Sequence, residues 1–240
     1  AVVNTNFEDY IDKYYLFWQR LIPNKEVQKV FAPIWEDVKH VWTRDIFRDV
    51  YHDHSQRLMW PEDYVNSSLY FEAKTFLNGL LIVEDKTSMA HGLESRVPFL
   101  DNDLVDFAQR LPVGLKLGNL REAIRVDENT PRKDLQNFQK TNDGKQILRK
   151  VMERYIPKEI TEGMKKGFSA PDASWFKGKS SEFVNGKILN DNAAIYQWLD
   201  RSAVKEMVDE HLTGTVNRRL LIWSLLNIEE LAGGILKEEF

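Results

Sequence analysis

Apolar side chains recur at steps of three and four residues through most of this chain, and this spacing constrains the fold more than any other feature. Between Pro61 and Ala90 the apolar positions are Val65, Leu69, Ala73, Phe76, Leu80 and Val83. Pro61 suits the first turn of a helix, where a backbone N–H is not needed. The alternation typical of half-buried strands is weak by comparison. The pattern therefore predicts a mainly α-helical chain.

Other segments show the same helical spacing. Helices are expected over residues 6–21, after Pro23, over 102–111, 144–157 and 193–212, in the short stretch 174–178 and over 217–236. The last of these is apolar on nearly all sides, which is typical of a buried helix. Residues 113–119 are expected to form a brief strand or an extended loop. The polar residues 121–143 are expected to form a surface excursion, and 162–171 a loop.

Composition excludes several classes of protein. The chain has 240 residues and a net charge of -4, from 33 basic and 37 acidic side chains. It therefore lacks the excess positive charge that typically attracts nucleic acid or an anionic membrane. With 0 Cys it can form neither disulfides nor a thiolate nucleophile. Neither a signal peptide nor a run of about 20 apolar residues is visible. We therefore expect a cytoplasmic protein with no nucleic-acid or membrane partner.

Charged residues interrupt an apolar stretch at residues 89–101, "MAHGLESRVPFLD". If a helix ends near Ala90, Gly92 is placed to adopt the left-handed conformation that stops it. Glu94 and Arg96 are two residues apart, so in extended backbone they point the same way, and Arg96 can reach Asp101 or another carboxylate. Phe99 and Leu100 would then fill the core. From the residues alone, a structural role, in which these charges stabilise a turn, is favoured over a catalytic one.

Two further patterns could carry chemistry. Lys165 and Lys166 precede Gly167 in "MKKGFSAP", and a lysine held by a turn is a suitable point charge for a phosphate or a developing oxyanion, although loop lysines are usually solvated. His52 and His54 are spaced like possible metal ligands but have no third ligand in register, so a surface helix end is the better interpretation.

Taken together and in order, four segments resemble the C-terminal half of the synthetase domain of glutamine-hydrolysing asparagine synthetases. They are "EDKTSMAHGLESRVPFLDNDLVDFAQRLP", "GKQILRKVMERYIP", "KKGFSAPDASWFKG" and "RRLLIWSLLNIEEL". The resemblance runs from about Tyr64 to the end of the chain. It implies the helical C-terminal portion of an α/β ATP-pyrophosphatase (adenine nucleotide α-hydrolase-like) synthetase domain. Residues 1–240 are thus expected to form a single domain or part of one.

The resemblance also implies an activity. Such enzymes use ATP with Mg²⁺ to adenylate the side-chain carboxylate of aspartate, and ammonia derived from glutamine then forms the amide. Lys165 matches the family's active-site lysine and Lys166 is the runner-up, whereas Gly163 replaces a basic residue usual in the family. Six further residues match its best-kept block or flank it, and we expect them to shape the pocket wall: Glu84, Asp85, Ser88, Glu94, Arg96 and Asp101.

The family's Ser-Gly-Gly-x-Asp-Ser phosphate loop and its N-terminal glutaminase cysteine have no match here. We therefore expect this chain to be a C-terminal segment that is inactive alone. Its expected partner is the missing N-terminal portion, and the complete enzyme is expected to be able to form a homodimer. The ammonia source and the acyl substrate stay open. Two alternatives remain: a related adenylating amidotransferase or cyclase that acts on another carboxylate, and a stand-alone helical binding module.

Overall fold

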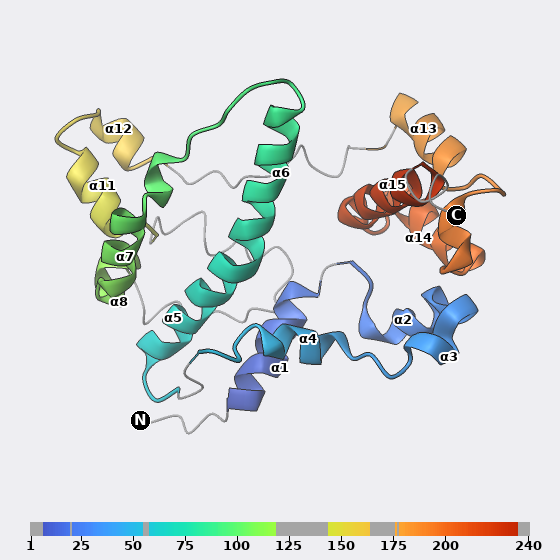
Figure 1. Ribbon diagram of the computed structural model, residues 1–240, viewed down its shortest axis with the longest axis horizontal. Helices are drawn as coiled ribbons and strands as arrows, with labels where there is room; N and C mark the ends of the chain where they lie inside the picture. The colour runs from blue at the N-terminus through green and yellow to red at the C-terminus, as the bar shows by residue number, and fades with distance from the viewer. Residues whose placement is uncertain are drawn as a thin grey trace. The chain divides into compact units, whose positions relative to one another are not determined.

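The structure is a computed structural model that describes residues 7–19, 21–54, 58–118, 144–163, 176 and 178–234. Within these residues it consists of helices and their connections, with one isolated antiparallel bridge between Leu117 and Gly144 (Figure 1). The expectation of a mainly helical chain is confirmed. Among the described helices none is long and apolar enough to cross a membrane.

The chain divides into two compact units. Unit 1 comprises Ala1–Leu16 with Arg44–Lys166, and unit 2 comprises Phe17–Thr43 with Gly167–Phe240. The expectation that residues 1–240 form a single or partial domain stays a prediction. Each unit contains segments from distant parts of the sequence, so each is built by long-range packing of short helices.

The helices of unit 1 agree with the periodic segments of the sequence. They are α1 (Phe7–Trp18, whose last two residues belong to unit 2), α4 (Thr43–Asp49), α5 (Pro61–Glu72), α6 (Asn78–Met89), α7 (Asn102–Arg110), α8 (Val113–Lys116), α11 (Gln146–Met152) and α12 (Lys158–Thr161). A π-helical stretch, Ala73–Leu77, joins α5 to α6 without a break, and a 3₁₀ turn covers Pro98–Leu100. The long helix expected from Pro61 onward is confirmed.

Local chemistry fixes both ends of this long helix. At its start, the Asp63 carboxylate accepts hydrogen bonds from the backbone N–H groups of Met59 and Trp60, both at 2.8 Å. At its end, Gly92 has φ +67°, and the N–H of Leu93 donates to the carbonyl of Ser88 at 3.0 Å. This is the left-handed stop that the sequence predicts.

The core of unit 1 is aromatic. Rings from α1, α4, the turn after α4 and α5 meet with their centroids 4.2–6.3 Å apart: Phe7, Tyr10, Tyr14, Tyr15, Phe47, Tyr51 and Phe71. Tyr51 is fully buried and its hydroxyl shares a hydrogen bond of 3.2 Å with the Tyr10 hydroxyl. Burial, the largest cause, raises the pKa of Tyr51 above its usual value.

One buried cation joins α1 to α4. The Arg44 guanidinium binds the carboxylates of Glu8, at 2.5 Å, and Asp12, at 2.7 Å, and its side chain is only 10% exposed. Arg48 binds the same Glu8 at 2.8 Å. Hydrogen bonds from Arg48 and then Arg44 hold the pKa of Glu8 below its ordinary value. The two helices are therefore joined by charge as well as by aromatic packing.

Unit 2 contains α2 (Asn24–Val30), α3 (Trp35–Val38), α13 (Lys179–Lys187), α14 (Arg201–Thr213), α15 (Arg219–Gly233) and 3₁₀ turns at Ala32–Ile34 and Ala194–Gln197. Its core is aliphatic and includes Val30, Ile188, Ile195, Val208 and Ile222. The helices expected after Pro23 and over 217–236 are confirmed, whereas 193–212 is divided into the 3₁₀ turn Ala194–Gln197 and helix α14. Most of 174–178 lies outside the described residues, as does the surface excursion expected at 121–143.

Three expectations about local structure are wrong. Val113–Lys116 forms a helical turn, where a strand or extended loop was expected, and only Leu117 takes part in a bridge. Helix α15 buries one side only, and its apolar residue Trp223 is 54% exposed. Phe99 does not fill the core, since it is 65% exposed. Apolar periodicity reports that a surface can be buried; it does not say that a partner for that surface lies within the same chain.

Candidate functional site

The C-terminal end of α6 positions three of the residues that the sequence singles out. Ser88 is buried, and its hydroxyl donates to the backbone carbonyl of Asp85 at 3.2 Å. The Glu84 carboxylate accepts a hydrogen bond of 3.1 Å from the Ser95 hydroxyl. Glu84 therefore ties the last turns of α6 to the segment that follows the Gly92 stop.

The remaining charges of this block pair locally. The Arg96 guanidinium lies 2.9 Å from a Glu94 oxygen, and both side chains are largely exposed, at 80% and 68%. Asp101 is the N-cap of α7, and its carboxylate accepts from the Leu104 N–H at 3.1 Å. Arg96 thus takes Glu94, not Asp101, because side chains two apart in extended backbone share a side. An exposed pair of this kind contributes about 0–1 kcal/mol.

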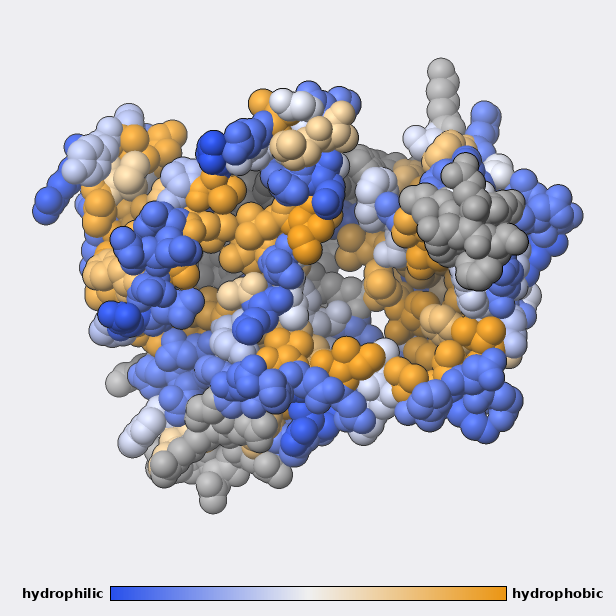
Figure 2. Space-filling view, in the orientation of Figure 1, coloured by the Kyte–Doolittle hydropathy of each residue, from blue (hydrophilic) through white to orange (hydrophobic). Residues whose placement is uncertain are grey.

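Many apolar side chains on α5, α6, α7 and the segment between α6 and α7 are exposed on the surface of unit 1. Figure 2 shows hydrophobic residues over α5 and α6 among hydrophilic ones. Those at least two-fifths exposed include Leu69, Phe76, Ile82, Val83, Met89, Leu93, Val97, Phe99, Leu104 and Phe107. The "ESRVPFLD" bend is therefore held by its own surface contacts and by the capped start of α7, and its apolar residues are not buried beneath it.

Lys165 and Lys166 lie outside the described residues, but the backbone that leads to them is described up to Gly163. Arg149 on α11 binds three backbone carbonyls there: Gly144 at 3.1 Å from Nε, Thr161 at 2.5 Å and Gly163 at 3.2 Å from Nη1. Sequence reasoning gave Arg149 no role. The available signal was a cation within the apolar helix of "GKQILRKVMERYIP", a weak one because helical arginines are usually solvated.

Gly163 fits this turn closely. A Cβ atom at this position would lie 3.0 Å from the carbonyl oxygen of Ile160 and 3.2 Å from that of Glu159. Contacts that short force the backbone to shift, so a glycine, in place of the basic residue usual in the resembling family, suits the tight turn seen after α12.

The two histidines do not form a metal site. His52 is exposed and lies 3.1 Å from Asp53, whereas the His54 ring stacks on Tyr70 with centroids 4.3 Å apart. His54 Nε2 lies 3.4 Å from the Ser67 hydroxyl. In the part of the chain that the structure describes, no group of three His, Asp or Glu residues could hold a metal ion.

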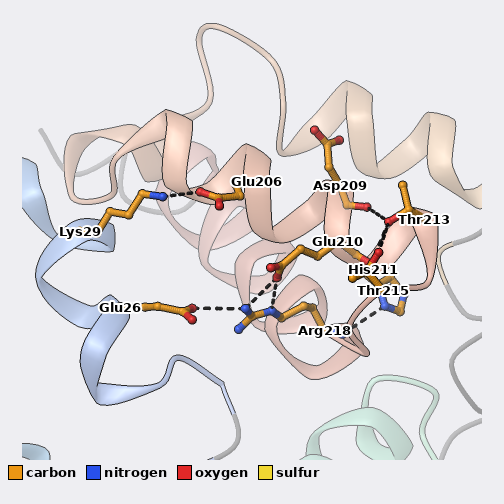
Figure 3. Close-up of polar contacts among 9 residues, drawn as sticks. All are labelled: Glu26, Lys29, Glu206, Asp209, Glu210, His211, Thr213, Thr215 and Arg218. Carbon is orange, nitrogen blue, oxygen red and sulfur yellow. Dashed lines mark hydrogen bonds and ion pairs between the residues drawn. The ribbon is translucent and has the colours of Figure 1, made fainter.

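Unit 2 contains a separate cluster of charges. The Arg218 guanidinium, 10% exposed, lies between Glu26 at 3.2 Å and Glu210 at 2.7 Å, and Lys29 pairs with Glu206 (Figure 3). A cavity of about 90 Å³ lies among these side chains, and a more open hollow of about 450 Å³ runs along α14.

The charges of the open hollow argue against a phosphate ligand. Its lining includes three carboxylates, Glu206, Asp209 and Glu210, and the cation of Lys205 on the same helix. Phosphates would be repelled there. Ion pairs with Glu26 and Glu210 balance the charge of Arg218 within the fold. The cluster therefore joins α2 to α14 and the start of α15.

Comparison with known proteins supplies a family. The family model for asparagine synthase matches residues 2–233. The chain is 27% identical to "Asparagine synthetase [glutamine-hydrolyzing] 1" of Bacillus subtilis over 68% of its own length and 22% of that protein. It is 28% identical to a putative asparagine synthetase of Mycobacterium tuberculosis over 84% of its length and 26% of that protein.

A more distant relative is "Amidase chyE" of Penicillium rubens, 25% identical over 62% of this chain and 20% of that protein. No solved structure gives a significant match. The chain spans about a quarter of the length of the curated relatives it matches first. Because the family model covers both units almost end to end, the chain belongs to the asparagine synthase family.

Proposed function

We propose that this chain supplies part of an ATP-dependent synthetase that converts aspartate to asparagine. The observation that carries the proposal is the family match over residues 2–233. The names of the Bacillus and Mycobacterium relatives support asparagine as the product and glutamine as the source of ammonia. Because the phosphate loop is absent from the sequence, we also propose that residues 1–240 do not complete the reaction by themselves.

The proposed chemistry has two steps. An oxygen of the aspartate side-chain carboxylate attacks the α-phosphorus of ATP, the bond to pyrophosphate breaks, and an acyl-adenylate forms. The nitrogen of ammonia then attacks the acyl carbon, loses a proton, and AMP leaves with the bridging oxygen. Negative charge develops at the α-phosphate in the first step and on the tetrahedral oxyanion in the second.

Lys165 is the residue that we propose meets this charge. A fixed ammonium group beside the α-phosphate favours both charged states more than the ground state, which is how such a group accelerates a reaction. Lys166 is the alternative. Three further residues would shape the wall of the pocket through their own contacts: Glu84 with Ser95, Ser88 with Asp85, and Asp101 with the first turn of α7.

Mg²⁺ is usually held by one or two carboxylates together with substrate phosphates, and among the described residues no three Asp, Glu or His side chains lie together in a group that could hold a metal ion. ATP and its metal, as substrate and cofactor of the complete synthetase, would need the family's phosphate loop in addition to these residues.

The lysine assignment is tested by Lys165→Ala in the complete synthetase, meaning these residues together with the phosphate loop and glutaminase domain. Loss of one electrostatic donor of this kind costs about 10²–10³ in kcat. Lys166→Ala is the matched control and should retain most turnover. Normal turnover by Lys165→Ala would show that this lysine is not the catalytic one, and a loss confined to Lys166→Ala would transfer the role to its neighbour.

A second candidate keeps the adenylation and changes the acyl substrate. The fungal relative named as an amidase favours it, because amide chemistry in similar proteins is not confined to asparagine. Product analysis with aspartate and with other carboxylic acids separates the two: asparagine as the main product supports the first, and an amide of another acid supports the second. Failure of every acid to form an amide would favour a binding module.

A further inference from the structure

Lys116, the last residue of α8, joins three helices of unit 1 through uncharged oxygens. Its Nζ donates to the backbone carbonyl of Gln109 on α7 at 2.9 Å and to the amide oxygen of Asn66 on α5 at 3.4 Å. Lys116 is half-buried, and Asn66 is exposed. The amine is therefore held in place without being fully enclosed.

Other lysines of the chain bind carboxylates. These ion pairs are Lys29 with Glu206, Lys39 with Glu36, Lys158 with Glu162, and Lys187 with Glu230. Hydrogen bonds to their carboxylates raise the pKa of Lys29 and Lys187 above the usual value. In the described part of the chain no carboxylate pairs with Lys116, and burial lowers its pKa.

The two hydrogen bonds of Lys116 also suit a neutral amine. An ammonium group has three N–H donors, so two acceptors leave one donor to be bound by solvent. A neutral amine has two N–H donors, which match the oxygens of Gln109 and Asn66, and one lone pair, which then points away from both. A lysine amine that is desolvated in this way is an activated nucleophile.

We propose that Lys116 is a modification site whose Nζ takes acyl groups from small acyl phosphates. The lone pair attacks the acyl carbon, the bond from this carbon to the phosphate oxygen breaks, and inorganic phosphate leaves with the electron pair. The nitrogen gives up a proton to water, and an amide remains. The inference does not rest on the proposed function, in which Lys116 has no part.

Acylation would also change how the helices are joined. The amide nitrogen keeps one N–H and loses the positive charge, so it can donate to Gln109 or to Asn66 but not to both. One of the two links from α8, to α7 or to α5, is then lost.

The test measures acetylation of each lysine by peptide mass spectrometry while the folded 240-residue chain is exposed to acetyl phosphate at mildly alkaline pH. Lys116 should react about three-fold faster or more than Lys150, an exposed lysine of α11, because more of its amine is neutral. In the chain unfolded by guanidinium the two rates should become similar. A rate at Lys116 no higher than that at Lys150 in the folded chain, or an advantage that persists after unfolding, would overturn the proposal.

Asn66→Asp tests the role of the uncharged acceptor with little change in shape. A carboxylate 3.4 Å from Nζ favours the ammonium form, so acetylation of Lys116 should slow to the rate of Lys150 or below it. Asn185→Asp, which adds the same charge at an exposed position of α13 in unit 2, is the matched control and should leave the Lys116 rate unchanged. An unchanged Lys116 rate in Asn66→Asp, or an equal loss in both variants, would contradict the proposal.

Discussion

His52 and His54 stand two residues apart, and their surroundings differ. His52 is exposed, whereas His54 stacks on Tyr70, and burial lowers the pKa of His54 below its usual 6.5. A histidine whose folded-state pKa is lowered stabilises the fold when neutral, so its contribution is complete above the unfolded pKa and is lost as the pH falls through about 6.5 toward the folded value.

We therefore expect the melting temperature of the chain to fall as the pH drops below about 6.5. In His54→Phe, which keeps an aromatic ring without a titrating group, this part of the profile should flatten. His52→Gln is the matched control and should leave the profile unchanged. A drop of equal size in the parent and in His54→Phe would contradict the assignment.

A second pH window belongs to Glu8. Hydrogen bonds from Arg48 and Arg44 lower the pKa of this carboxyl, so the stability it contributes is present above its unfolded value of 4.5 and is lost as the pH falls through the lower folded value. The loss from His54 begins as the pH falls below about 6.5 and that from Glu8 only below 4.5, so the histidine effect begins first as the pH falls.

At the scale of single residues, local chemistry could be predicted better than pairing. The left-handed conformation of Gly92 was predicted for a helix that ends near Ala90, because it follows from hydrogen bonds within a few residues. The partner of Arg96 was left open between Asp101 and another carboxylate. Choosing Glu94 required knowing that the bend stays extended and exposed.

The helices themselves can be tested with two glycines near one another in sequence. Gly79 lies inside α6 and Gly92 just past its end, and in both cases a Cβ atom would meet nothing within 4 Å. They differ in backbone conformation, since Gly92 has φ +67°. Substitution by alanine therefore measures the effect of backbone conformation on the free energy of unfolding, because packing changes little at either position.

Gly79→Ala should stabilise the chain by about 0.5–1 kcal/mol, because alanine is the better helix former. Gly92→Ala should destabilise it by about 1–2 kcal/mol, the cost of a left-handed conformation for a residue with a side chain. Urea unfolding of the two variants and the parent measures both. Shifts of the same sign would contradict the described end of α6.

The location of helices was predictable because apolar spacing is a local signal. The signal failed at Val113–Lys116, where a four-residue helical turn is too short to show a period. It also failed to show what covers each apolar face: α15 is apolar around most of its surface, yet Trp223 and Leu231 are more than half exposed. Burial depends on the whole assembly of helices, which periodicity does not contain.

At the scale of the molecule, the family could be recognised from ordered motifs, and the match over residues 2–233 confirms it. The geometry of the proposed site could not be read in the same way. The stabilising role of Arg149 depends on carbonyls 5, 12 and 14 residues away in sequence, which no spacing rule brings together. Backbone carbonyls carry no side-chain identity, so a sequence gives no sign of such a contact.

The claim that this family member serves an adenylating synthetase is tested most directly by following oxygen. The complete synthetase would be given ATP, ammonia and aspartate labelled with ¹⁸O in its side-chain carboxylate, and the products analysed by mass spectrometry. Attack on the α-phosphorus predicts one labelled oxygen in AMP and one retained in asparagine. Label in inorganic phosphate, or AMP without label, would contradict the claim.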